Sequence, residues 1–191
     1  KTADGKGTIT VTGMVEEEEM GNEGRRMRRK STARSSVDTV LTALRLFTDI
    51  DPGNYDIHLN FPGGIPVDGP SAGAAILSAI YSAITLTPID NKIAMTGEVS
   101  IRGEIKPIGG IAAKIAAAVQ AGIERVLIPA ENWQENFNAR NIHIIPVKRV
   151  EEVLKATLCN PGEKLSQRTF IPETNVLSAS HSGDKGCDCT Y

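Results

Sequence analysis

The sequence predicts one α/β domain with a mixed sheet, in which hairpin strands come early and β-α units come later. Its length of 191 residues suits one domain, or one domain with a tail. The hydrophobic content of 40% is sufficient for a core, and the aromatic content of 4% makes that core aliphatic. Segments of β-branched alternation and segments with apolar residues at helical spacing follow one another along the chain, which is typical of an α/β fold.

The first half of the chain is expected to contain alternating strands and helices. Residues 7–15, GTITVTGMV, alternate β-branched and small residues and predict a strand. Apolar residues at helical spacing then predict a helix over 35–48, with Ser35 or Ser36 as its N-cap. Further elements are expected as a strand over 55–61, a buried helix over 72–83 and a short strand over 92–96.

Residues 16–30 form a charge block, with EEEE followed by RRMRRK. Its two halves nearly cancel, so two interpretations stay open, a hairpin with facing opposite charges and a solvated loop. The basic run alone is similar to a nucleic-acid patch, but the glutamates beside it argue against that use.

The second half predicts a hairpin followed by β-α units. Residues 98–108, EVSIRGEIKPI, predict a hairpin that turns at Arg102-Gly103. A helix is expected over 111–121, after Gly109-Gly110, and Gly122 is suited to end it. The remaining elements are a strand over 125–128, a helical stretch over 129–137, a strand over 142–146 and a helix over 150–158. We expect the domain to span residues 1–158 and residues 159–191 to form a tail with little structure, because prolines and small polar residues break every pattern there.

The bulk properties exclude several function classes. The net charge of −2 gives no bias toward nucleic acid or membrane partners, and no apolar run reaches the roughly 20 residues of a membrane helix. The three cysteines all lie late and form no disulfide framework, and Cys187 and Cys189 are too close together for usual zinc spacing. We therefore expect an intracellular protein. The start at Lys1, without an initiator Met, suggests a piece of a longer chain.

Ser71 stands where a Gly/Pro-rich loop runs into an apolar helix, in the segment GGIPVDGPSAGAAILSAIYSAI at 63–84. Such a junction presents free backbone N–H groups and the positive end of a helix dipole. Three uses are open: Ser71 is an N-cap, the loop binds an anion such as phosphate, or Ser71 is a nucleophile whose oxyanion the loop stabilises.

Lys114 is the candidate base for a nucleophilic serine. The three histidines, at positions 58, 143 and 181, have no helper motif around them. Lys114 lies within GGIAAKIAAAVQAG with no acidic residue within four positions, so it either snorkels to water or is buried for a purpose. Burial would lower its pKa and allow it to act as a base. Thr96, at a strand end, is placed to hydrogen-bond this amine and hold it toward Ser71.

Four motifs carry a resemblance to a known family. They are DGPSAG at 68–73, AMTGE at 94–98 with IRG at 101–103, PIGGIAAKIAAA at 107–118 and AGIERVLIPAEN at 121–132. In order and in serine-to-lysine spacing they resemble the peptidase domain of the Lon proteases, over residues 7 to about 158. The stretches GMVEEEE and RRKSTARSS resemble the bacterial B-type, sporulation-related branch.

The resemblance implies a Ser-Lys dyad serine endopeptidase. Ser71 would be the nucleophile, Lys114 the general base and Thr96 its orienting partner, and the backbone N–H groups of Asp68 and Ser71 would form the oxyanion hole. The substrates would be unfolded or damaged proteins and peptides, and the assembly would be a homohexameric ring. No cofactor is expected for this chain, because the ATP and Mg²⁺ of the family belong to a separate ATPase module, and the 191 residues contain no GxxxxGK[ST] loop.

One departure and two alternatives accompany this prediction. Many family members carry His-x-His before the serine loop, whereas this chain has His58-Leu59-Asn60, which puts the role of the second histidine in doubt. The first alternative is a Lon-like assembly domain without catalysis. The second is a small-molecule kinase of related topology, suggested by the Pro66-x-x-Gly69-x-Ser71 pattern, although no second Gly-rich segment supports it.

Overall fold

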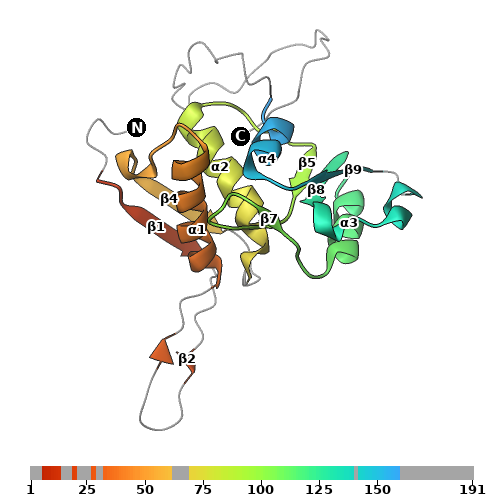
Figure 1. Cartoon of the computed structure of the whole chain (residues 1–191), viewed down its shortest axis with the longest axis horizontal. Coiled ribbons are helices and arrows are strands. Elements are labelled where there is room, and N and C mark those ends of the chain that lie inside the picture. The colour runs from red at the N-terminus through yellow and green to blue at the C-terminus, as the bar shows by residue number, and fades with distance from the viewer. Residues whose placement is uncertain are drawn as a thin grey trace, which may run out of the picture.

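A three-stranded parallel sheet organises the second half of the chain (Figure 1). Its strands β5 (Ile93–Met95), β8 (Arg125–Pro129) and β9 (His143–Val147) pair in the order β5-β8-β9. The connection from β5 to β8 carries α3 (Ile111–Gln120), since parallel neighbours require a crossover. The computed structural model describes residues 6–13, 19–20, 27–28, 32–61, 69–139 and 142–159.

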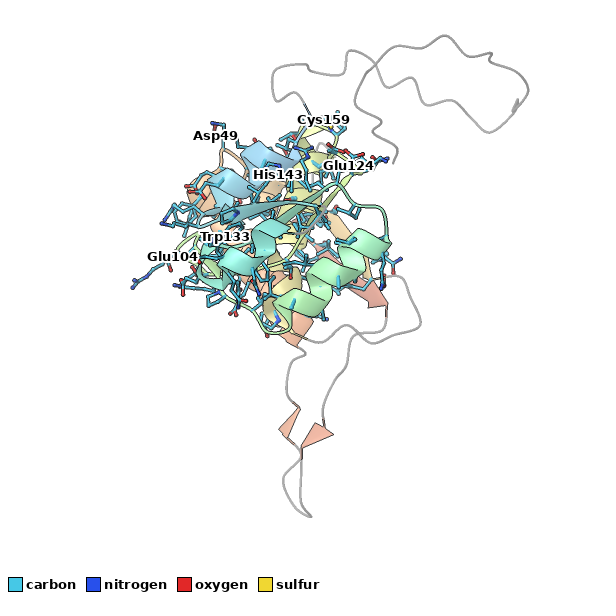
Figure 2. All side chains as sticks on the ribbon, turned by 90° about the vertical axis from the view of Figure 1, so that its right-hand side faces the viewer. Asp49, Glu104, Glu124, Trp133, His143 and Cys159 are labelled. Atoms are coloured by element: carbon cyan, nitrogen blue, oxygen red, sulfur yellow. The ribbon has the colours of Figure 1, made fainter. Side chains whose placement is uncertain are left out.

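The central strand β8 separates two apolar clusters. Successive side chains of a strand point to opposite faces. Leu127 accordingly packs into the larger cluster, whereas Val126 and Ile128 pack with α3. The helices of the larger cluster are α1 (Thr32–Phe47), α2 (Gly73–Thr85) and α4 (Val150–Thr157). Figure 2, seen from the side of α3, shows that helix in front of the strands. The helices thus cover β8 on both faces, and the sequence prediction of a mixed α/β fold is confirmed.

The first half of the chain adds two further strand pairs. Strands β1 (Ile9–Gly13) and β4 (Ile57–Phe61) are parallel, with α1 between them in the chain. The charge block contains β2 (Glu19–Met20) and β3 (Met27–Arg28), which are antiparallel with Glu19 opposite Arg28. The hairpin interpretation of this block is therefore the correct one for the residues that the structure describes there.

Helix α1 begins earlier than its sequence pattern predicted. Ser35 and Ser36 were expected to cap it, but the helix starts at Thr32 and Ser36 is 6% exposed inside it. Ala33 and Ser36 extend the buried stripe of Val37 and Val40 by one turn at helical spacing. Because these two residues are small, the spacing of large apolar residues did not indicate that turn.

The elements nearest the candidate site follow the predicted order. Helix α2 comes after the 3-10 turn η2 (Pro70–Ala72), and α4 packs against α2. The predicted hairpin is present as β6 (Glu98–Val99) and β7 (Ile105–Lys106). Its turn lies where predicted, since Gly103 has a φ of 72° and donates its N–H to Ser100 O at 2.9 Å.

The helical stretch predicted over 129–137 is wrong as a single helix. Two 3-10 turns stand there, η3 (Ala130–Asn132) and η4 (Glu135–Ala139). Trp133 interrupts them with extended backbone angles, φ −62° and ψ 138°. This stretch contains Asn132, Asn136 and Asn138, and asparagine favours turns over the interior of an α-helix.

The described part of the chain ends in contacts with the main body. Leu158 bridges Ile89, and the Cys159 N–H donates to Pro88 O at 2.8 Å. Residues 160–191, with His181 and the Cys187-x-Cys189 pair, lie outside the described residues, so the division into a domain and a tail stays a prediction. No helix within the described ranges has both the length and the apolar character needed to cross a bilayer.

Replacing Ser78 by alanine is expected to stabilise the fold. Ser78 is fully buried in α2, and its Oγ has no hydrogen-bond partner in the described part of the chain. An unsatisfied buried hydroxyl costs about 1–3 kcal/mol, so Ser78→Ala should raise the free energy of unfolding by about 1 kcal/mol. Urea denaturation of the two proteins checks this. A decrease in stability would show that Ser78 Oγ has a partner in solution.

Candidate active site

Ser71 lies in the turn before α2 and does not cap that helix. The N-cap position of α2 is Ala72, and no side chain makes a capping bond there. Ser71 is the middle residue of η2, and Gly69 enters this turn with a φ of 110°, a conformation that favours glycine. The N-cap interpretation of Ser71 is therefore wrong, because its hydroxyl is directed elsewhere.

The backbone of Ser71 is fixed by the segment that follows β5. Its carbonyl accepts from the Gly97 N–H at 2.9 Å and from Thr96 Oγ1 at 3.2 Å. Thr96 is itself tied to the central strand, since its N–H donates to Leu127 O at 3.1 Å. The position of the serine is thus set by the parallel sheet and not only by its own loop.

Lys114 reaches Ser71 from α3. Ile111, Ile115 and Ala118 form the buried face of this helix, and Lys114 lies on the same side, one turn beyond Ile111. Its Nζ donates to Ser71 Oγ at 2.8 Å and to Thr96 Oγ1 at 3.2 Å. The amine is therefore not snorkelling to water. The structure brings Ser71, Lys114 and Thr96 together, as the sequence predicted.

The environment of Lys114 favours its neutral form. Partial burial lowers the pKa of Lys114 below the ordinary value of a lysine, because desolvation disfavours the charged amine. No carboxylate among the described residues forms an ion pair with it that would counter this effect. A neutral amine beside a hydroxyl can accept its proton, which is the requirement for a general base.

A cavity of about 340 Å³ adjoins these three side chains. Apart from Ser71, Thr96 and Lys114, its lining is apolar and mostly small: Ala72, Ala75, Ala94, Met95, Ala117, Ala118 and Val126. Such a cavity can hold an apolar side chain of a ligand whose backbone passes Ser71 Oγ.

The remaining candidate residues are placed less closely or not at all. Asp68, predicted to supply an oxyanion-hole N–H, lies outside the described residues, and the corresponding role of the Ser71 N–H stays a prediction. His58 Nε2 lies 2.8 Å from Thr12 Oγ1 on the exposed face of β1 and β4. No group of metal-binding side chains occurs within the described ranges.

One contact near the site was not predicted from the sequence. Asn132, in η3, accepts from the Ile108 N–H at 2.8 Å and donates to the Ile108 carbonyl at 3.1 Å. Ile108 precedes Gly109-Gly110, the entry to α3. The only signal in the sequence is an asparagine after Pro129-Ala-Glu, which by itself indicates a turn residue.

Comparison with known proteins places this geometry in a family. The model of the Lon protease (S16) C-terminal proteolytic domain matches residues 1–160. Lon protease 2 of Bacillus subtilis (strain 168) is 51% identical over 177 residues, which cover 92% of this chain and 32% of that protein.

More distant relatives agree. The archaeal Lon protease of Thermoplasma acidophilum is 37% identical over 78% of this chain, and the Lon protease of Brucella suis biovar 1 is 39% identical over 84%. The chain spans about a third or less of the length of these relatives. The kinase alternative finds no support among these relatives. This chain belongs to the family of Lon protease (S16) C-terminal proteolytic domains.

Proposed function

We propose that this chain is a serine endopeptidase that cleaves peptide bonds with a Ser-Lys dyad, in which Ser71 is the nucleophile and Lys114 the general base. The observation that carries the proposal is the 2.8 Å hydrogen bond between Lys114 Nζ and Ser71 Oγ. An apolar cavity beside this pair and a lowered pKa of Lys114, caused by burial, support the same function.

The reaction begins when neutral Lys114 takes the hydroxyl proton of Ser71 while Oγ attacks the scissile carbonyl carbon. The C–O bond forms, and the carbonyl oxygen becomes an oxyanion beside the backbone N–H groups of the loop before α2. Lys114 then gives the proton to the leaving nitrogen, and the C–N bond breaks. A water molecule, deprotonated in the same way, hydrolyses the ester. Thr96 holds the amine in place through both steps.

The substrates that this site favours are extended, flexible chains. An apolar side chain fills the cavity lined by Ala72, Met95 and Ala117, which selects an apolar residue next to the scissile bond. We further propose that the parent protein acts on unfolded or damaged proteins as a homohexamer, and that ATP and Mg²⁺ serve a separate module of that parent.

The proposal is tested by labelling and digestion. A fluorophosphonate should form an adduct on Ser71, located by mass spectrometry, and casein should be cleaved next to apolar residues. A chain that neither reacts at Ser71 nor cleaves casein would instead be the assembly domain without catalysis. Reaction at Ser71 without cleavage would show a formed site that lacks its ring or ATPase partner.

The rate of hydrolysis should increase with pH through the pKa of Lys114. Only the neutral amine can act as base, so kcat/KM falls about tenfold per pH unit below that pKa. Because burial lowers the pKa of Lys114, kcat/KM should reach half of its maximum at a pH below about 10.4, the pKa of an ordinary lysine. A pH profile of a fluorogenic peptide measures it, with circular dichroism confirming the fold at each pH. A maximum near pH 5 would contradict a lysine base.

Removing the hydroxyl of Thr96 should impair catalysis more than folding. Thr96→Val keeps the shape but loses the bonds to Lys114 Nζ and to Ser71 O. Lys114 becomes charged as it takes the proton of Ser71, and a hydrogen bond to a charged group is worth about 1.5–3 kcal/mol, so kcat should fall about 10- to 100-fold. Steady-state kinetics measure this loss, and Thr96→Ser, which restores the hydroxyl, should recover most of it. Equal rates for the Val and Ser variants would refute the orienting role.

A further inference from the structure

The two glycines that lead into the helix of Lys114 contribute no side-chain packing. Helix α3 has only ten residues, and its N-cap, Gly110, makes no side-chain capping bond. Gly109 and Gly110 are exposed, and a methyl group added to either would meet no described atom within 4 Å. The glycines therefore add nothing to the contacts that Ile111 makes with the core in the first turn of α3, although Lys114 must stay within hydrogen-bond distance of Ser71.

Ile108 is the residue at which this entry segment is fastened. Both of its backbone groups are bound by one side chain, since Asn132 Oδ1 accepts from the N–H at 2.8 Å and Asn132 Nδ2 donates to the carbonyl at 3.1 Å. This pair of bonds replaces the pairing that a neighbouring strand would supply. Only an amide of this length carries an acceptor and a donor side by side for this purpose.

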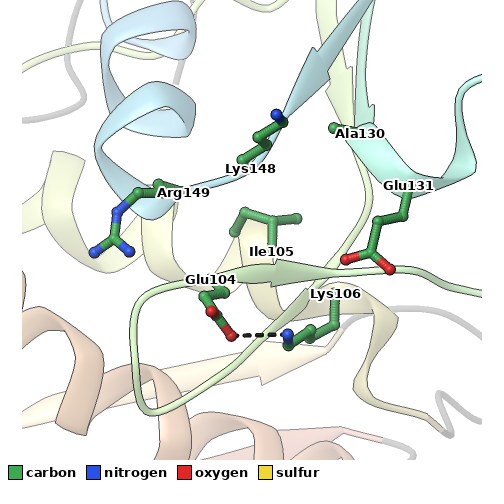
Figure 3. Close-up of a pocket in the computed structure, with 7 residues that line it drawn as sticks. All are labelled: Glu104, Ile105, Lys106, Ala130, Glu131, Lys148 and Arg149. Carbon is green, nitrogen blue, oxygen red and sulfur yellow. Dashed lines mark ion pairs between the residues drawn. The ribbon is translucent and has the colours of Figure 1, made fainter.

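Asn132 connects η3 to the segment after β7, beside a cavity that separates other parts of the two stretches. A cavity of about 520 Å³ opens between Ile105-Lys106 and Ala130-Glu131, so these stretches do not pack closely there. Figure 3 shows Glu131 pointing from η3 toward β7, where Lys106 pairs with Glu104 at 2.8 Å. Glu104 raises the pKa of Lys106 through hydrogen bonding and charge, and Glu131 raises it less, through charge alone. Glu131 is exposed and Lys106 is partly exposed, so the attraction between these two side chains is weak.

The turn that carries Asn132 follows directly on β8, the strand that also binds Thr96. Turn η3 follows β8, the central strand, whose Leu127 and Ile128 are fully buried. Leu127 O accepts the N–H of Thr96. Strand β8 thus binds Thr96 directly and binds the entry to α3 through Asn132. The same strand therefore fixes the positions of Thr96 and of the helix that carries Lys114.

We propose that Asn132 is a positioning residue of the peptidase site, which holds Lys114 against Ser71 and Thr96 by clamping the backbone of Ile108. This proposal rests on the proposed function for its kinetic consequence. Asn132 does not touch the reacting atoms. Without the clamp the first turn of α3 depends on the packing of Ile108 and Ile111 alone for its position relative to η3, and a displacement of about 1 Å at a reacting group costs about 10²-fold in rate.

The test compares Asn132→Ala with Asn136→Ala in the full chain. Asn136 is an exposed asparagine of the neighbouring turn η4 and serves as the matched control. Kinetics with a fluorogenic peptide give kcat and KM, and NMR of ¹³C-labelled lysine gives the titration of Lys114, assigned through Lys114→Met. We expect Asn132→Ala to lower kcat about 10²-fold with little change in KM, and to raise the pKa of Lys114 as the amine becomes hydrated. Asn136→Ala should change neither.

The outcomes that would overturn the proposal differ from the one that would overturn the proposed function. If Asn132→Ala retains the kcat and the Lys114 titration of Asn136→Ala, the clamp has no positioning role. If Asn132→Ala does not fold, Asn132→Asp decides, because Asp keeps the acceptor for the Ile108 N–H and places a second oxygen against the carbonyl. A kcat and a Lys114 titration of Asn132→Asp equal to those of the unchanged protein would refute the proposal. If the unchanged protein neither cleaves the peptide nor reacts with the fluorophosphonate at Ser71, the proposed function fails, while the Lys114 titration still tests the clamp.

Discussion

Replacing Lys114 by methionine is expected to lower kcat by about 10⁴-fold or more, to the background of the assay. Methionine keeps the length and the apolar stem of lysine but cannot take the proton of Ser71 Oγ, from which the amine is 2.8 Å away. Removing one member of a nucleophile-base unit in serine proteases costs about 10⁴- to 10⁶-fold. Hydrolysis of casein and of a fluorogenic peptide measures the loss.

The fold should tolerate this change, because methionine removes a partly buried amine that burial disfavours in its charged form. Ser71→Ala should be equally inactive, and the double variant should be no worse than either single one, since two residues that act as a unit are not additive. Lys155→Met, at an exposed position of α4, is the control and should keep full activity. Substantial activity in Lys114→Met would mean that another group takes the proton.

Replacing Gly73 by alanine should disturb both the fold and the site. A Cβ at this first residue of α2 would lie 2.8 Å from Val99 N, 3.1 Å from Val99 Cγ2 and 3.2 Å from Gly97 O. The close neighbours are mostly backbone, so either α2 or the 97–99 segment must move. Overpacking of this kind costs about 1–3 kcal/mol, and we expect the free energy of unfolding to fall by that amount.

The effect on activity follows from the contacts of the same segment. Ala74 N donates to Gly97 O, and Gly97 N donates to Ser71 O, so separating α2 from residue 97 displaces the serine. We expect kcat to fall about 10²-fold, measured together with urea denaturation. Gly109→Ala, whose added methyl group meets no described atom within 4 Å, is the control for stability and should not lower the free energy of unfolding. An unchanged free energy of unfolding in Gly73→Ala would show that α2 and β6 can move apart without cost.

Much of the fold and of the candidate site could be predicted from local patterns. The spacing of apolar residues indicated α2, α3 and α4, and the turn at Arg102-Gly103 indicated the β6–β7 hairpin. Ser71 and Lys114 were singled out because a serine at a glycine-rich helix start and a lysine without an acidic neighbour are unusual in themselves. Thr96 was singled out by its place at a strand end, and the order and spacing of the motifs added the family.

Contacts between distant segments could not be predicted in this way. The parallel pairing of β1 with β4, the first turn of α1 and the break at Trp133 depend on which surfaces meet after folding. The clamp of Asn132 on Ile108 joins residues 24 positions apart through backbone groups, which no side-chain pattern records.

The sequence by itself therefore determined most of the elements, the family and the reactive residue types, because these follow from periodicity, from motif order and from the chemistry of single side chains. The tertiary structure decided where the amine of Lys114 points, what lowers its pKa and what holds Ser71 in place. These properties depend on burial and on hydrogen bonds between elements far apart in the chain. Such contacts form only when β8 brings α2, α3 and the 96–97 segment together.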